Sequence, residues 1–299
     1  MKNVDVSVVM AVKNEEKFIS EALDSIIGQL GLSTEIIIID DSSSDNTFNI
    51  CNAYASNYEN IILEKNISRG KVSAFNMGVD LSKGKFICLF AGDDIMPFNS
   101  LNTRYLSVKN IDSSIPIVGL SKLTVLSEDK KFNGQIIPKK ENIGATSGVS
   151  PLMNRNAIKN IFPIPEILPN EDTWMKLCVE EFTFFKIIHS NTICCKWRMH
   201  SNNSINISEP FDIYSKKTSE RQNAYNLFYK KYKDTKYINN KTKTKIKSLI
   251  KVENLRKENK FIRILFTRGP LVDRLRAISC SNKNIFYIRK IFFRLLSGW

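Results

Sequence analysis

Short apolar runs alternate with helical patterns over the first ninety residues of this chain. The runs are β-branched and aromatic, are bounded by turn residues, and span residues 6–12, 35–39, 61–63 and 86–90. Between the first two runs, apolar residues recur at helical spacing from Phe18 to Leu30, and the polar pair 14–15 is expected to open that helix. This alternation predicts an α/β fold with a mostly parallel central sheet.

Polar side chains follow three of these predicted strands. Asp40 and Asp41 end the second run, Asp93 and Asp94 follow the fourth, and residues 14–15 follow the first. Because the carboxyl ends of parallel strands meet at one edge of a sheet, we expect these side chains to line one cleft. An isolated Gly-Asp-Asp turn would be unremarkable, so the coincidence of three such turns is the argument for a site.

Two common nucleotide-binding motifs are missing. No GxGxxG follows the first run and no GxxxxGK[ST] occurs in the chain, which argues against a dinucleotide fold and a P-loop. A phosphate group would therefore need a metal on the carboxylates, aided by cationic side chains. The six cysteines have no CxxC spacing, so we expect reduced, mostly buried thiols and no zinc site.

The pattern after residue 100 is less regular. Turn residues at 129–131 and 133–134 predict a hairpin turn, and those at 144–148 a flexible link. Apolar spacing predicts a helix over 152–161 and a strand over 182–188. Glu171 and Asp172 precede a further helical pattern. They can be interpreted as acids that favour a helix N-terminus or as site residues.

Charge divides the chain near residue 206. Residues 207–299 hold 23 Lys and Arg against 7 Asp and Glu, whereas residues 1–206 are close to neutral. We expect a globular domain at 1–206 and a basic, helical region at 207–299. The last stretch, 285–296, mixes aromatic residues with Arg and Lys, which suits either a helix in an anionic membrane interface or a helix packed on the first domain. Nucleic acid is a weaker alternative, because no recognition motif accompanies the charge.

Six motifs in this order and spacing resemble those of glycosyltransferase family 2, which has the GT-A fold, over about the first 205 residues. They lie at Ser7–Glu16, Ile39–Asp45, Gly70–Gly78, Ala91–Asp94, Glu171–Asp172 and Arg198–His200. The resemblance implies a pocket for a nucleotide-sugar donor and a divalent metal, Mg²⁺ or Mn²⁺. The implied pocket residues are Ala11, Val12, Asn14, Glu15, Asp40, Lys71, Asp93, Arg198 and His200.

The resemblance also assigns chemistry to the acids. Asp93 and Asp94 would hold the metal, and Asp172 would be the general base, whereas His200 is equally open to a structural interpretation. Three positions depart from the family pattern: Ala11 replaces a proline, Lys13 an aromatic residue, and Ala91 the first acid of a DxD motif. The sequence has no QxxRW-like stretch, which argues against a processive polysaccharide synthase.

The implied activity is transfer of a sugar, with inversion, from a nucleotide-diphosphate donor, a UDP-sugar being favoured, to a hydroxyl of a glycan or lipid-linked acceptor. This would serve cell-surface polysaccharide or glycolipid synthesis. The alternative is an inactive GT-A-like module that acts as a membrane or nucleic-acid adaptor through its basic tail. A sugar nucleotidyltransferase would need a Gly-rich N-terminal loop with Arg, which is absent. No apolar window approaches ~18 residues and no signal peptide is recognisable, so we expect a cytoplasmic protein, peripheral at the inner face of the membrane.

Overall fold

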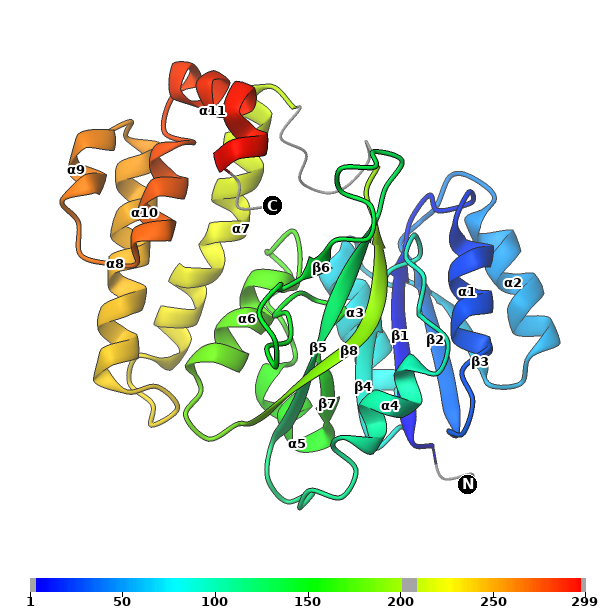
Figure 1. Cartoon of the computed structure of the whole chain (residues 1–299). Helices are drawn as coiled ribbons and strands as arrows, with labels where there is room; N and C mark the ends of the chain where they lie inside the picture. Colours follow the sequence, from blue (N-terminus) through cyan, green and yellow to red (C-terminus); the bar gives the residue numbers. More distant parts are fainter. Residues whose placement is uncertain (1–3, 201–208, 297–299) are drawn as a thin grey trace. The chain divides into compact units, whose positions relative to one another are not determined.

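The computed structural model describes residues 4–200 and 209–296, with side chains up to residue 290. These residues fall into two compact units (Figure 1). The first is an α/β unit that comprises the residues up to Glu180 together with Phe184–Met199. The second is helical and comprises Glu181–Thr183 and the residues from His200 onward.

A mixed sheet of eight strands forms the framework of the first unit (Figure 1). The strands are β1 Val6–Val12, β2 Thr34–Asp40, β3 Ile61–Lys65, β4 Phe86–Phe90, β5 Ile117–Leu126, β6 Ile136–Ile137, β7 Leu152–Asn154 and β8 Lys186–Arg198. Their order is β3-β2-β1-β4-β7-β5-β6, and β8 pairs with β5. The first four strands are parallel, as are β5 and β8, whereas β7 and β6 pair antiparallel with their neighbours. The predicted fold class is therefore confirmed.

Helices cover both faces of this sheet. They are α1 Ile19–Ile27, α2 Thr47–Asn57, α3 Lys71–Leu81, α4 Ser100–Leu106, α5 Arg155–Ile161 and α6 Asp172–Glu181. Val8 and Met10 of β1 belong to the core cluster that contains the apolar residues of α1 and Cys51 of α2. The intervening Val9 faces α3, because successive strand residues point to opposite faces. A Cβ on Gly78 of α3 would lie 2.4 Å from Val9 Cγ1, so only glycine permits this approach.

The structure differs from three sequence predictions of element boundaries, in each case because of tertiary or capping contacts. The first helix begins at Ile19 rather than at 14–15, because Asn14 has a φ of 56° and the loop bonds the segment after β2. The segment 152–161 begins as strand β7, and its helix starts only after Asn154, whose side chain accepts a hydrogen bond from the Ala157 N–H. The strand predicted at 182–188 is β8, which starts at Lys186 and extends to Arg198. The segment before it, including Phe182, packs in the helical unit instead.

The second unit contains the helices α7 Phe211–Tyr232, α8 Asn240–Lys257, α9 Phe261–Leu265, α10 Leu271–Ile278 and α11 Lys283–Leu296. Phe182 contributes to its aromatic core and contacts the rings of Phe228, Tyr232 and Tyr237. None of the helices in residues 4–200 and 209–296 is both long and apolar enough to cross a membrane.

The terminal stretch predicted to lie in a membrane or on the first domain uses part of its apolar surface inside the helical unit. Phe286 of α11 is fully buried, and its ring lies 4.9 Å from that of Tyr214 and 5.6 Å from that of Phe211. Tyr287 and Ile288 are exposed. The side chains beyond residue 290, including Phe292 and Phe293, lie outside the described residues. The described part of this helix thus packs on α7.

Candidate functional site

The strand order places a candidate site where the chain changes direction across the sheet. The chain moves outward from β1 through β2 to β3, then returns to add β4 on the other side of β1. Ligands in open α/β sheets bind at the carboxyl ends of the strands at such a switch point. The loops that follow β1 and β4 meet there, because a Cβ on Gly92 would lie 3.2 Å from the Cγ of Glu15.

The loops after β1 and β2 are fastened to each other. Asn14 accepts a hydrogen bond from the Ser44 N–H at 2.8 Å, and the Glu15 N–H donates to Thr47 Oγ1 at 2.7 Å. In addition, Val12, which is fully buried, accepts a hydrogen bond from the Asp41 N–H through its carbonyl. The predicted pocket residues from Ala11 to Glu15 therefore belong to one firmly held segment at the edge of the sheet.

Asp40 and Asp41 differ in how their carboxylates are used. Asp41 bonds the side chain of Asn66 at 2.8 Å and the Gly70 N–H at 2.9 Å, so it holds the loop that leads into α3. Asp40 is 3% exposed; one of its oxygens accepts from the Ser43 N–H, but Oδ1 has no hydrogen-bond partner within the described structure. A buried carboxylate oxygen without a donor is energetically costly, so a ligand donor at this position is favoured.

The acidic turn after β4 is braced by β8. Ile95 and Lys196 exchange two backbone hydrogen bonds, which place the end of β8 beside the turn. The Arg198 N–H then donates to Asp94 Oδ1 at 2.9 Å. Strand β8 thereby fixes the direction of the Asp94 carboxylate, which is 2% exposed.

The side chain of Arg198 is engaged with α1 and the acidic turn. Its Nε donates to the carbonyl of Asp93 at 2.8 Å, its Nη2 pairs with the Glu21 carboxylate, and the guanidinium lies over the Phe18 ring. These contacts give Arg198 a bracing role, and direct contact with a diphosphate remains a prediction. His200 belongs to the second unit, so its predicted role also remains a prediction.

Two carboxyl groups, one in the loop after β1 and one in the acidic turn after β4, have strongly raised pKa values. Burial and the neighbouring Asp93 raise the pKa of Glu15 to about 8, and the same two causes raise that of Asp94 to about 7. Ionising these groups together is unfavourable because like charges repel in a poorly hydrated site. A divalent cation would relieve this repulsion.

The donor set at the turn fits a hard divalent cation. Within the described residues, no group of three or more His, Cys, Asp and Glu side chains is arranged to hold a metal ion. Mg²⁺, however, is commonly held by one or two carboxylates together with substrate phosphates. Asp93 and Asp94, with the carboxyl group of Glu15 nearby, match this pattern.

Lys71 connects the acidic turn to a second pair of acids. It lies at the start of α3, and its Nζ is 3.3 Å from Glu171 Oε1. Glu171 is 3% exposed, and burial followed by the nearby Asp172 raises its pKa while Lys71 opposes the shift. Asp93 also acts electrostatically on Lys71. The acids predicted from distant parts of the sequence therefore share one cation.

Asp172 is held by hydrogen bonds to both of its carboxylate oxygens. The Gly148 N–H donates to Oδ1 at 2.9 Å, and Asn170 Nδ2 donates to Oδ2 at 2.8 Å. A Cβ at residue 148 would lie 2.5 Å from Glu171 Oε1 and 2.7 Å from Asp172 Oδ1, so glycine is required there. These two bonds fix the orientation of the Asp172 carboxylate.

Sequence reasoning missed the two residues that orient Asp172. Asn170 stands directly before the predicted acid pair, so an amide beside a candidate base was a usable signal. Gly148 gave none, because the link at 144–148 indicated flexibility rather than contact with residues more than twenty positions later.

Comparisons with known proteins bear on this arrangement. Residues 7–121 match the family model described as Glycosyl transferase family 2. The matched segment runs from β1 through the turn after β4 into β5. Residues 7–121 therefore form a glycosyl transferase family 2 segment. This confirms the predicted family.

Curated relatives are similar over the same part of the chain. The glycosyltransferase GlyG of Streptococcus pneumoniae is 33% identical over 113 residues, which are 38% of this chain and 38% of GlyG. The poly(ribitol-phosphate) beta-glucosyltransferase of Bacillus spizizenii is 34% identical over 138 residues, which are 45% of this chain and 20% of that protein. The matched part thus spans well under two thirds of either relative.

Solved structures extend the similarity in fold to most of the chain. TarS residues 1–349 of S. aureus superpose with a TM-score of 0.61 at 14% identity, covering 97% of this chain and 91% of that one. The mannosyltransferase PcManGT of Pyrobaculum calidifontis, solved with GDP-Man and Mn²⁺, gives a TM-score of 0.57 at 14% identity, with coverages of 98% and 89%. At such identities the likeness establishes the fold alone.

Proposed function

We propose that this chain is an inverting glycosyltransferase that moves a sugar from a nucleotide-diphosphate donor to a hydroxyl of an acceptor. The observation that carries the proposal is that Lys71 pairs with Glu171 and also interacts electrostatically with Asp172 and Asp93. Asp93 and Asp94 could hold the metal that neutralises the leaving diphosphate. Glu171 and Asp172 could receive the proton of the acceptor hydroxyl. An inactive adaptor would have no use for this complete set.

The donor would be placed by the loops after β1, β2 and β4. The unpartnered Oδ1 of buried Asp40 would accept a hydrogen bond from the nucleobase or ribose. Asp93 and Asp94 would hold Mg²⁺ or Mn²⁺, which when bound would supply positive charge to stabilise the leaving diphosphate. Lys71, next to this site, would add a second positive charge. The complexes of TarS with UDP-GlcNAc and of PcManGT with GDP-Man support a nucleotide-sugar donor, with a UDP-sugar favoured.

Asp172 would act as the general base. The acceptor oxygen attacks the anomeric carbon as the bond from that carbon to the diphosphate oxygen breaks, and the hydroxyl proton passes to the Asp172 carboxylate. Attack from the face opposite the leaving group inverts the anomeric centre. The hydrogen bonds from Gly148 and Asn170 keep the carboxylate oriented for this transfer.

The acceptor is proposed to be a hydroxyl-rich cell-surface polymer or its lipid-linked precursor. Support comes from relatives whose names specify poly(ribitol-phosphate) glucosylation and minor teichoic acid biosynthesis. We further propose that the two units correspond to a catalytic domain and a basic helical region, and that the protein works in the cytoplasm at the inner face of the membrane.

A donor screen tests the proposal. Purified protein is incubated with a panel of nucleotide sugars and Mn²⁺, and released nucleoside diphosphate is measured. We expect release of nucleoside diphosphate from one donor class. EDTA should abolish this release, and Asp94→Ala should remove both the release and the metal-dependent binding of the donor. No donor hydrolysis or transfer across the panel, with intact folding by circular dichroism, would contradict the proposal.

A further inference from the structure

The hairpin formed by α9 and α10 presents apolar side chains on its outer side. Six of them are exposed to solvent, and Phe266 and Val272 reach 85% and 66% exposure. We call this set the α9–α10 surface; it consists of Ile262, Leu265, Phe266, Leu271, Val272 and Leu275. Single exposed apolar residues are common on proteins, but six of them within residues 262–275, on two successive short helices, indicate a contact site.

The opposite side of the same hairpin is already used for packing. Ile264 of α9 and Ala277 of α10 are buried in a cluster with Val252 of α8. Arg274 of α10 also donates a hydrogen bond to the Leu265 carbonyl, which ties the two short helices together. The apolar residues of the outer side are therefore not needed to attach the hairpin to the helical unit.

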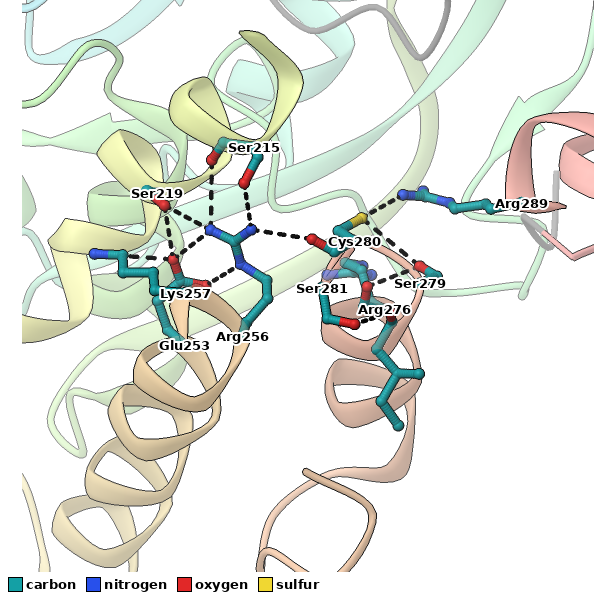
Figure 2. A network of polar contacts seen from close by, with 11 residues as sticks. Ser215, Ser219, Glu253, Arg256, Lys257, Arg276, Ser279, Cys280, Ser281 and Arg289 are labelled. Atoms are coloured by element: carbon teal, nitrogen blue, oxygen red, sulfur yellow. Dashed lines mark hydrogen bonds and ion pairs between the residues drawn. The ribbon is translucent and has the colours of Figure 1, made fainter. Parts of the chain in front are cut away.

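A buried polar network holds the end of α10 in place (Figure 2). Arg256 of α8, which is 2% exposed, donates to the carbonyl of Cys280 at 3.2 Å and to Ser215 Oγ of α7 at 2.8 Å. Its Nε pairs with Glu253 at 2.8 Å. The α9–α10 surface thus stands on a fixed support, and its exposure does not come from a loosely attached segment.

The charge around this surface is strongly positive. Residues 260–276 contain five Lys and Arg residues against a single Asp. Asp273 pairs with Arg276 at 3.5 Å, whereas Arg263 and Arg268 form no ion pair within the part of the chain that the structure describes. Aliphatic and aromatic side chains flanked by arginines without ion pairs complement a partner surface that has an anionic outer layer over an apolar interior.

We propose that the α9–α10 surface docks on an anionic lipid bilayer. Its apolar side chains would enter the boundary between headgroups and acyl chains, and Arg263 and Arg268 would remain at the level of the lipid phosphates. Helices of this length lie in the interface and do not span it. The proposal concerns a segment different from α11, whose Phe286 is consumed by packing on α7.

The proposal is tested with full-length protein and vesicles, without any need for catalytic activity. Flotation compares vesicles of phosphatidylcholine with vesicles that also contain phosphatidylglycerol, at low and high salt. We expect binding only with phosphatidylglycerol, weakened by salt because the electrostatic part is screened. Phe266→Ser with Leu271→Ser should abolish it, and Arg263→Ser with Arg268→Ser should weaken it about tenfold or more.

Matched variants separate this surface from other sources of binding. Leu30→Ser removes an exposed apolar side chain from the first unit and should leave binding unchanged. Tyr287→Ser with Ile288→Ser tests the exposed side of α11 and should also leave it unchanged. Circular dichroism melting checks the fold of every variant, which the exposure of the substituted residues should preserve.

The variant Phe266→Trp reports directly on the surface. Its tryptophan emission should shift to the blue, and brominated lipid should quench it, when phosphatidylglycerol vesicles are added. Emission that is already blue-shifted without vesicles would show that protein covers the surface, and a dimer by light scattering that Phe266→Ser disperses would identify a second copy. Either result, or equal binding to neutral vesicles, would overturn the proposal.

Discussion

Lys71 Nζ lies 3.3 Å from Glu171 Oε1, although about half of the first unit's sequence separates the two residues. The pair joins the start of α3 to the residue that precedes α6. Since Asp93 acts on the same ammonium group, the pair also connects the proposed donor side of the site to its acceptor side. The effects of substitutions on the two sides should therefore be separable but electrostatically coupled.

Asp172→Asn should remove turnover while it spares donor binding. The amide cannot accept the acceptor proton, so kcat should fall about 10²–10⁴-fold. The donor is held by other residues, so its dissociation constant, measured by calorimetry with the unreactive nucleoside diphosphate, should stay the same. Transfer at the wild-type rate would show that another group is the base.

Asn170→Ala should lower kcat without changing KM for the donor. The substitution removes the 2.8 Å hydrogen bond to Asp172 Oδ2. A hydrogen bond to a charged group commonly contributes enough free energy for its loss to lower kcat about tenfold. Loss of this donor should also raise the pKa of Asp172 and move the acidic limb of the kcat profile upward. Asn160→Ala, which removes an amide bonded only to the Asn156 carbonyl in its own helix, is the control. A proportional change in donor KM would contradict a positioning role.

Gly148→Ala should damage both stability and turnover. The new methyl group would meet Glu171 and Asp172 oxygens at 2.5 and 2.7 Å, and relieving such overpacking commonly costs about 1–3 kcal/mol. The free energy of unfolding, measured in urea, and kcat should both fall. Gly28→Ala is the control, since its nearest contact would be 3.3 Å and its φ is −70°. An unchanged kcat would separate Gly148 from the proposed base.

The metal-free protein should lose stability as pH rises. Glu15, with an ordinary pKa of 4.5, reaches about 8 in the folded state, and Asp94, ordinarily 3.8, reaches about 7. The folded state thus binds these protons more tightly than the unfolded state, so the stabilisation is complete at low pH and is lost between about pH 4 and pH 8. The two shifts together set an upper limit of about 9 kcal/mol on the total change.

Calorimetric melting at several pH values checks this expectation. Glu15→Gln should flatten the decline, because it removes the group with the higher pKa. Mn²⁺ should raise the melting temperature more at about pH 8 than at about pH 5, since the carboxyl groups must lose protons to bind it. A melting temperature that rises with pH in EDTA would contradict the expected sign.

Arg256→Met should destabilise the helical unit but leave donor hydrolysis intact. It leaves Glu253, which is 5% exposed, without its buried partner, and breaking such pairs typically costs about 3–5 kcal/mol (Figure 2). Replacing Glu253 by Met as well should recover much of the loss, because no unpaired charge then remains. Equal instability of the single and double variants in urea would show that packing, rather than charge, governs the effect.

The regular part of the fold follows from local patterns. The strands β1, β2 and β4 are fully buried runs flanked by turns, and periodicity identifies such runs reliably. The predicted start of α1 was wrong because Asn14 and its neighbours form hydrogen bonds with the loop after β2. No local sequence pattern encodes such a contact. Tertiary contact likewise determined where β8 begins, since Phe182 is drawn into an aromatic cluster of the other unit.

The acids of the candidate site can be proposed from the sequence, whereas the groups that orient them cannot. Asp40, Asp93, Asp94 and Asp172 stand in motifs, so their types and spacing identify them. The hydrogen bonds that orient them come from backbone groups of Arg198 and Gly148, and any residue but proline supplies a backbone N–H. Such supports leave no trace in side-chain identity.

The last contact needed by the acidic turn is supplied very late in the chain. Asp93 and Asp94 follow the fourth strand, yet their brace is Arg198 at the end of β8. During translation, a nascent chain that has emerged only as far as the end of α6 already contains Asp40, Asp93, Asp94 and Asp172. It still lacks Arg198 and therefore lacks this brace. The acidic turn can therefore take up the braced form proposed to bind the donor only after β8 has been synthesised, and synthesis of the helical region gives time for β8 to dock.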